Sequence, residues 1–187
     1  QVIDALNSGK NVFVEKPLAL TLDDLDKIDK SYNKANSSNT VRLMVGFNRR
    51  YAPHVVKMRK LLESHRSPKS IIMTVNAGAI PGEHWVQNTL IGGGRIIGEG
   101  CHFIDLMRHL VGHKITNFQA MMMGNVPGVE VREDKASITL SFEDGSFGTI
   151  HYLTNRGSAF PKERIEVFCD NAVLQMDNYR VLTGYGW

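Results

Sequence analysis

From residue 115 onward, the sequence is dominated by short segments of β-branched and aromatic residues with turn residues between them. Segments of this composition and length are typical of strands. Asp144-Gly145 lies between two of them and is the kind of dipeptide most typical of a two-residue hairpin turn. Strands at such short spacing pair with one another, so this half of the chain predicts one large, mostly antiparallel sheet. The predicted strands are 115–123, 136–142, 147–152, 164–168 and 172–176.

Ahead of residue 115, the pattern alternates between helical and strand segments. An apolar helical face ends at Gly9, a second helix begins with a capping box of Thr21 and Asp24, and a third begins at Pro53. We therefore expect an α+β fold in which helices cover one face of the sheet. A second copy of the chain would cover the other face, because an exposed apolar face favours association. The strands predicted between these helices are 11–15, 41–47 and 70–77.

Composition argues against several classes of function. The 187 residues are 42% hydrophobic and 22% charged with a net charge of +3, and no basic stripe interleaved with aromatic residues suits a nucleic acid. No apolar run approaches the roughly 20 residues that cross a bilayer. Cys101 and Cys169 lie far apart and suggest neither a disulfide framework nor a metal site. We expect a cytoplasmic globular protein with no membrane, nucleic-acid or metal partner.

Two motifs in a fixed order are the most specific features of the sequence. Residues 9–17 read GKNVFVEKP, and residues 100–106 read GCHFIDL after a glycine-rich stretch. Together they resemble the Gfo/Idh/MocA family of oxidoreductases, which includes glucose-fructose oxidoreductase and inositol dehydrogenase. Members of this family end their dinucleotide-binding domain with G-K-x-V-x-x-E-K-P and carry G-x-H-x-x-D-L further on. The resemblance extends over nearly the whole chain.

The resemblance implies hydride transfer between NAD or NADP and a hydroxyl-bearing carbon of a sugar, a cyclitol or a sugar derivative. It also implies that residues 1–17 end a Rossmann domain and that residues 18–187 form a substrate-binding and dimer-forming domain. The G-x-G-x-x-G fingerprint that binds the cofactor phosphates is missing, since Ile97 follows Gly92 and Gly94 at the third position. The chain opens in mid-helix, so we expect the fingerprint upstream and neither cofactor affinity nor turnover for this piece alone.

Lys16 and His102 are the catalytic candidates that the resemblance implies. An alcohol loses its hydroxyl proton as hydride leaves, and histidine has a pKa suited to accept that proton near neutral pH. A nearby ammonium group stabilises the developing alkoxide. Glu15, Lys16 and Pro17 would form the nicotinamide-facing rim, with a cis peptide before Pro17 as is common in the family. A surface lysine and a core-edge histidine are the ordinary alternatives, so the enzyme hypothesis requires both side chains to face one open cleft.

One position departs from the family pattern. The family often has an aspartate four residues before the histidine, where this chain has Gly98. Glu99 is adjacent and would replace that acid only after a shift of one residue. The departure keeps a second hypothesis open, a non-catalytic sugar-binding or assembly domain derived from such an enzyme. Retention of both Lys16 and His102 favours the enzyme.

Side chains near the predicted strand ends are candidates for substrate binding. Asn48, Arg49, Arg50 and Tyr51 follow a strand end, where sheets of this kind present residues to ligands. Trp85 suits stacking on a sugar ring, although burial under a loop is an alternative. Arg49 and Arg50 are equally consistent with surface or dimer ion pairs. The substrate-binding candidates are Asn48, Arg50, Tyr51, Trp85 and Glu99, and the weaker candidates are Asn155, Arg156 and Lys162.

Overall fold

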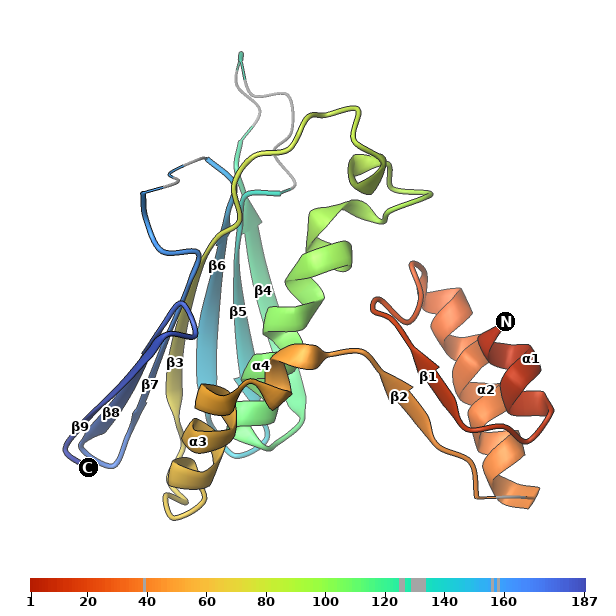
Figure 1. Cartoon of the computed structure of the whole chain (residues 1–187), viewed down its shortest axis with the longest axis horizontal. Coiled ribbons are helices and arrows are strands. Elements are labelled where there is room, and N and C mark those ends of the chain that lie inside the picture. Colours follow the sequence, from red (N-terminus) through yellow and green to blue (C-terminus); the bar gives the residue numbers. More distant parts are fainter. Residues whose placement is uncertain (39, 125–126, 129–133, 156, 158) are drawn as a thin grey trace.

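The computed structural model describes residues 1–187 apart from residues 39, 125–126, 129–133, 156 and 158. The chain forms a small packing unit at its N-terminal end and a larger unit built on a sheet (Figure 1). Each unit has its own cluster of buried apolar side chains. Within the described part of the chain, no helix is both long and apolar enough to cross a membrane.

The small unit consists of two helices and a parallel pair of strands. Thr21 and Asp24 form the predicted cap, since the Thr21 hydroxyl accepts a hydrogen bond from the Asp24 amide at 3.2 Å. Leu6, Ile28 and Val41 are its buried centre. The predicted domain boundary at residue 17 stays a prediction, although this apolar cluster extends beyond it. The elements are α1 (Val2–Asn7), β1 (Val12–Val14), α2 (Leu22–Ser38) and β2 (Leu43–Val45).

The large unit is a seven-stranded sheet with the order β4-β5-β6-β3-β7-β8-β9. All neighbouring strands are antiparallel except the central pair, β3 and β6, which is parallel. The predicted large, mostly antiparallel sheet of an α+β fold is confirmed. The strands are β3 (Ser70–Asn76), β4 (Ile115–Met122), β5 (Ala136–Phe142), β6 (Phe147–Leu153), β7 (Glu163–Cys169), β8 (Ala172–Asp177) and β9 (Val181–Tyr185).

The edge strand β9 is the one strand of the sheet that the sequence patterns do not predict. Asn178 and Tyr179 precede it with φ angles of 49° and 55°. Tyrosine seldom adopts a positive φ angle, so the sequence does not indicate a turn at this place. The turn at Gly145, where φ is 85°, is by contrast marked by its Asp-Gly dipeptide. β9 nevertheless pairs with β8.

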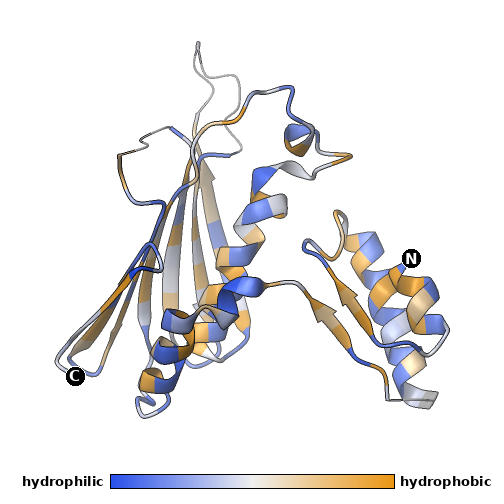
Figure 2. Cartoon of the chain, in the orientation of Figure 1, coloured by the Kyte–Doolittle hydropathy of each residue, from blue (hydrophilic) through white to orange (hydrophobic). Residues whose placement is uncertain are grey.

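Two helices, α3 (Pro53–Leu62) and α4 (Cys101–Val111), cover one face of the sheet (Figure 1). Pro53 occupies the start of α3 as predicted. Hydrophobic and polar positions alternate along the central strands, as Figure 2 shows, so the hydrophobic positions of each strand share one face. The largest fully buried side chains of α4 are Phe103, Leu106, Met107 and Leu110.

Gly148 marks the closest approach of α4 to the sheet. A Cβ atom at this position would lie 2.6 Å from the Met107 Sδ and 2.9 Å from the Ile71 carbonyl oxygen. We expect Gly148→Ala to lower the free energy of unfolding by about 1–3 kcal/mol, because the packed core must shift to admit the methyl group. Urea unfolding of this variant and of Gly124→Ala measures the effect. Nothing in the described structure lies within 4 Å of a Cβ at Gly124, so equal losses in the two variants would contradict the prediction.

Candidate active site

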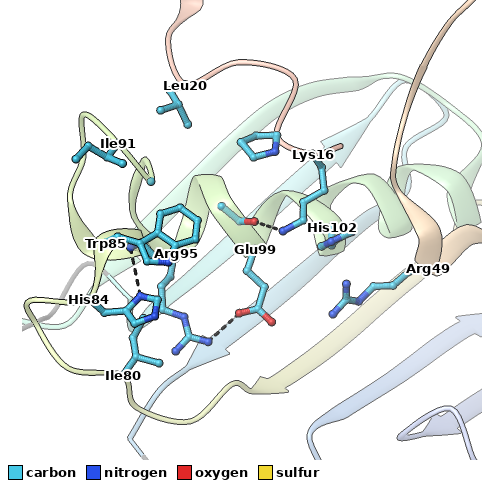
Figure 3. Close-up of a pocket in the computed structure, with 14 residues that line it drawn as sticks. Lys16, Leu20, Arg49, Ile80, His84, Trp85, Ile91, Arg95, Glu99 and His102 are labelled. Atoms are coloured by element: carbon cyan, nitrogen blue, oxygen red, sulfur yellow. Dashed lines mark hydrogen bonds and ion pairs between the residues drawn. The ribbon is translucent and has the colours of Figure 1, made fainter. Parts of the chain in front are cut away.

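A pocket of about 420 Å³ lies where the two units meet (Figure 3). The turn after β1 forms one wall with Lys16, Pro17 and Leu20. Because the rest of the lining comes from beyond β2, the small unit and the remainder of the chain build the pocket together. The remaining walls are the short 3-10 helix η1 (Asn48–Tyr51), the loop around η2 (Trp85–Gln87), the π-helical turn η3 (Ile96–Gly100) and the first turn of α4.

Lys16 reaches into this pocket from the small unit. The peptide between Lys16 and Pro17 is cis, as the resemblance implies. The Lys16 amine donates a hydrogen bond to the Gly98 carbonyl oxygen in the π-helical turn at 2.6 Å. This oxygen belongs to the backbone, so the contact does not depend on which side chain stands at the position where the resemblance implies an aspartate.

His102 lies in the first turn of α4 and is 5% exposed. Its Nδ1 is buried and has no hydrogen-bond partner among the described residues. Burial, followed by the positive charges of Arg49 and Lys16, lowers the pKa of the imidazole to about 4. A neutral imidazole is the form that accepts a proton, so His102 is available as a base at neutral pH.

We expect the His102 ring to titrate near pH 4 in the folded chain. The unfolded ring has a pKa of about 6.5, so the unfolded state binds more protons between the two values. The free energy of unfolding should therefore fall as the pH drops from about 6.5 towards 4. An NMR titration of the ring C2–H signals, assigned with His102→Asn, measures this pKa. A value near 6.5 would contradict the buried, cation-flanked environment.

Glu99 is the centre of a hydrogen-bonded network in the pocket. Its carboxylate accepts hydrogen bonds from Arg95 at 2.8 Å and from the Tyr152 hydroxyl at 2.5 Å, and the Lys162 amine lies 3.4 Å away. Burial raises the pKa of this carboxyl, but the hydrogen bonds from Arg95 and Tyr152 outweigh it and hold the pKa at about 2. Glu99 is thus permanently charged with both oxygens engaged, which makes it a poor proton acceptor at neutral pH.

The glycine-rich segment ahead of η3 forms a close-packed wall. A Cβ atom at Gly92 would lie 2.5 Å from the Val86 Cα, and Gly93 and Gly94 have φ angles of 74° and 77°. Arg95 follows them, and its guanidinium also donates to the Gly78 carbonyl oxygen at 2.6 Å. These contacts fix the π-helical turn that carries Gly98 and Glu99.

Arg49 and Arg50 are neighbours in η1 but point to different surroundings. Arg49 lines the pocket, pairs with Glu163 through N–O distances of 2.8 and 3.1 Å, and lies 4.5 Å from the centre of the Phe103 ring. Arg50 pairs with Asp105 and is not among the residues that line the pocket. The sequence singles out Arg50 as a substrate-binding residue, whereas the structure brings Arg49 to the pocket.

The other predicted residues are divided between this pocket and the surface. Trp85 lines the pocket and is 61% exposed, so the alternative that it is buried under a loop is wrong. Asn48 and Tyr51 are not among the lining residues. Glu15 is exposed, and its carboxylate lies beside Gly46, where an added Cβ would be 3.0 Å from Oε2.

Of the weaker candidates, Lys162 reaches Glu99, Asn155 does not line the pocket, and Arg156 lies outside the described residues. Sequence reasoning placed Arg49 near a ligand crevice without ranking it among the substrate-binding candidates, and it missed Arg95 as a pocket residue. Glu163, the acid that pairs with Arg49, lies 114 positions further along the chain, so no local sequence pattern indicates the pair. The requirement set by the enzyme hypothesis is met, because Lys16 and His102 line one pocket.

Two family models match the chain. Residues 55–175 match the GFO/IDH/MocA C-terminal domain, and residues 1–47 match the oxidoreductase family NAD-binding Rossmann fold. The chain belongs to the Gfo/Idh/MocA family of oxidoreductases. The first match falls in the large unit, and the second covers the small unit with its parallel strand pair.

Relatives in this family include the uncharacterized oxidoreductase YrbE of Bacillus subtilis and the myo-inositol 2-dehydrogenase of Thermotoga maritima, each 28% identical over 185 residues. The alignments cover 96% and 97% of this chain but 52% and 54% of the relatives, so the chain spans about half of their length. It is therefore homologous to NAD-dependent inositol and sugar dehydrogenases over mainly their C-terminal domain.

A solved structure shares the fold. The WlbA dehydrogenase from Bordetella pertussis, in complex with NADH and UDP-GlcNAcA, matches with a TM-score of 0.78. The match covers 97% of this chain and 56% of that one at 20% sequence identity.

Proposed function

We propose that this chain provides the substrate-binding and proton-transfer side of an NAD(P)-dependent dehydrogenase that acts on a hydroxyl group of a sugar, a cyclitol or a sugar derivative. The observation that carries the proposal is the shared pocket, into which Lys16 and the neutral His102 project from different units. The relatives include a myo-inositol 2-dehydrogenase, and the structure with the same fold holds NADH and UDP-GlcNAcA. Both myo-inositol and UDP-GlcNAcA carry ring hydroxyl groups.

The proposed reaction assigns one role to each catalytic residue. His102 accepts the hydroxyl proton of the substrate, because its low pKa keeps the ring neutral. The Lys16 ammonium stabilises the negative charge that develops on the same oxygen. When bound, the nicotinamide cofactor would supply the acceptor for the hydride that leaves the substrate carbon. The electron pair of the carbon–hydrogen bond thus leaves as hydride while the proton passes to His102.

The remaining lining suits the binding of a ring with hydroxyl groups. Trp85 offers an exposed aromatic face for stacking on such a ring. Glu99 is too firmly hydrogen-bonded to act as the base, so we assign it the role of holding Arg95 and the π-helical turn in place.

The cofactor is proposed to be NAD or NADP, with Glu15, Lys16 and Pro17 at the nicotinamide-facing rim. Lys16 and Pro17 line the pocket, which fits this assignment, whereas Glu15 lies beside Gly46. The sequence contains no phosphate-binding G-x-G-x-x-G. We therefore expect the 187-residue chain by itself to have negligible cofactor affinity and no turnover.

A second candidate function rests on Gly98. With no acid at this position, the Lys16 amine is bonded to a backbone oxygen, and the neighbouring Glu99 is already saturated by other donors. A non-catalytic sugar-binding or assembly domain would have this arrangement if the proton relay had been lost.

The test is hydride transfer by a completed enzyme, in which residues 1–187 replace the matching segment of the Thermotoga maritima myo-inositol 2-dehydrogenase. We expect reduction of NAD or NADP with at least one member of a panel of cyclitols, sugars and nucleotide sugars. Circular dichroism and cofactor titration establish that the completed enzyme is folded and binds the dinucleotide. A folded, cofactor-binding protein with no turnover on the whole panel would favour the non-catalytic domain.

We also propose that the uncovered face of the sheet pairs with a second copy of the chain. Four apolar side chains on this face are 37–52% exposed, namely Ile72, Phe147, Leu153 and Phe168. Sedimentation should detect a dimer, and Ile72→Lys with Phe168→Glu should yield a folded monomer because charges replace the apolar contact. Leu90→Lys, at an 88% exposed loop position, is the control that should leave the dimer intact. A monomeric unsubstituted chain would contradict this proposal.

A further inference from the structure

A second pocket, of about 480 Å³, lies at the opposite end of α4 from His102. Its lining combines η1, α3, the last turn of α4 and the loop that follows α4. None of its lining residues belongs to the candidate active site. Its basic side chains are Arg50, Arg59, Arg108, His109, His113 and Lys114.

The four permanently charged groups of this pocket differ in how far they are neutralised. Arg50 pairs with Asp105, and Arg59 donates to the Leu110 carbonyl oxygen at 3.2 Å. In the described part of the chain, neither Arg108 nor Lys114 has a side-chain partner within ion-pair distance.

The acidic groups near the pocket do not balance these charges. Glu143 is the one carboxylate in the lining, and it accepts a hydrogen bond from the Lys114 backbone amide at 3.4 Å. Asp144 lies 3.9 Å from the His113 ring. Burial and then the charges of Arg50 and Arg59 lower the pKa of His109, as expected where cations crowd one another.

A simpler role explains only part of this arrangement. Cations near the C-terminal end of a helix stabilise its exposed carbonyl groups, which accounts for Arg59 at the Leu110 carbonyl and for Arg108 in the last turn. Arg50 comes from η1 and Lys114 from beyond the end of the helix. Their convergence on a cavity larger than a single phosphate group is typical of an anion-binding site rather than of helix capping.

We propose that this pocket binds a small molecule that carries two or more phosphate groups. Arg108 supplies a planar donor and Lys114 a point-charge donor for phosphate oxygens, and Arg50 and Arg59 add donors that Asp105 and the Leu110 carbonyl oxygen do not occupy. The volume of about 480 Å³ accommodates a diphosphate together with part of an attached group or bound water. The inference is independent of the proposed dehydrogenase function, because the two pockets share no lining residue.

Calorimetric titration of the 187-residue chain with inorganic diphosphate tests the proposal. We expect saturable binding that is about tenfold weaker or worse in the double variant Arg108→Gln, Lys114→Gln, because each lost group removes charge-assisted hydrogen bonds. These two side chains have no described internal partner, so the variant should keep the unfolding free energy of the parent chain. The control is Lys30→Gln with Lys57→Gln, which removes the same charge from exposed positions outside the pocket.

Each outcome decides for or against the site. Equal weakening in both double variants would reduce the effect to general charge attraction and overturn the proposal. Orthophosphate or citrate binding as tightly as diphosphate would overturn the assignment to multiple phosphates. NMR shifts of the His109 and His113 rings on binding support the site, whereas shifts at His102 alone would place the ligand in the other pocket. Tighter binding of ADP than of diphosphate would identify a nucleotide, and equal binding would identify diphosphate itself.

Discussion

Glu163→Ala is expected to lower the free energy of unfolding by about 3–5 kcal/mol, because it leaves the largely buried Arg49 cation without a counter-ion. The pair has N–O distances of 2.8 and 3.1 Å, and the side chains are only 16% and 7% exposed. Burial alone would lower the pKa of Arg49, but its hydrogen bonds to Glu163 raise it, so the arginine stays charged. The Phe103 ring covers the same guanidinium, which gives the cation no route to water on that side.

Glu166→Ala is the matched control because Glu166 lies on the same strand. Its pair with Arg164 is more exposed, at 43% and 21% for the arginine and the glutamate, and such pairs contribute about 0–1 kcal/mol. Urea unfolding of both variants gives the comparison. Comparable small losses would show that the Arg49 side chain finds solvent when Glu163 is removed.

The largest effect on activity is expected from the two catalytic candidates. In the completed enzyme, His102→Asn and Lys16→Met should each lower kcat by about 10²–10⁴-fold, the range in which a positioned proton acceptor contributes. Lys10→Met, at an exposed position of the small unit, should leave kcat unchanged. Activity of the unsubstituted enzyme should be lost at low pH as His102 becomes protonated near pH 4.

Steady-state kinetics separate chemistry from binding. A loss confined to KM in either variant would mean that the residue holds substrate equally in the ground and transition states. Retention of kcat in His102→Asn would remove this residue from the proton-transfer step and favour another base.

The fold could be predicted from the sequence more completely than the side-chain contacts within the site. The short β-branched and aromatic segments and the Asp144-Gly145 turn are local signals, and both led to the correct sheet. Strand β9 was not predicted, because the turn before it contains Asn178 and Tyr179 with positive φ angles that no sequence motif indicates. The motif at His102 could be recognised from the sequence because its residues lie in one short segment, 100–106.

The site partners depend on contacts between distant residues. Arg49 meets Glu163 across 114 positions, and nothing in the sequence distinguishes it from the adjacent Arg50. The role of Glu99 was equally hidden, since the π-helical turn before α4 changes which side chains of that segment reach the pocket. Glu99 also accepts a hydrogen bond from the Tyr152 hydroxyl across 53 positions, a contact that no local sequence pattern indicates.

The division of the pocket between two units has a kinetic consequence. Lys16 belongs to the small unit and His102 to the large one, and the chain crosses from one to the other near Phe47. A rotation about this crossing would break the Lys16–Gly98 hydrogen bond and draw the ammonium away from the imidazole. Substrate could then enter and product leave while the site is chemically inert. In the completed enzyme we propose that closure of the two units is a step of turnover alongside proton transfer, and that substrate selection can act on it.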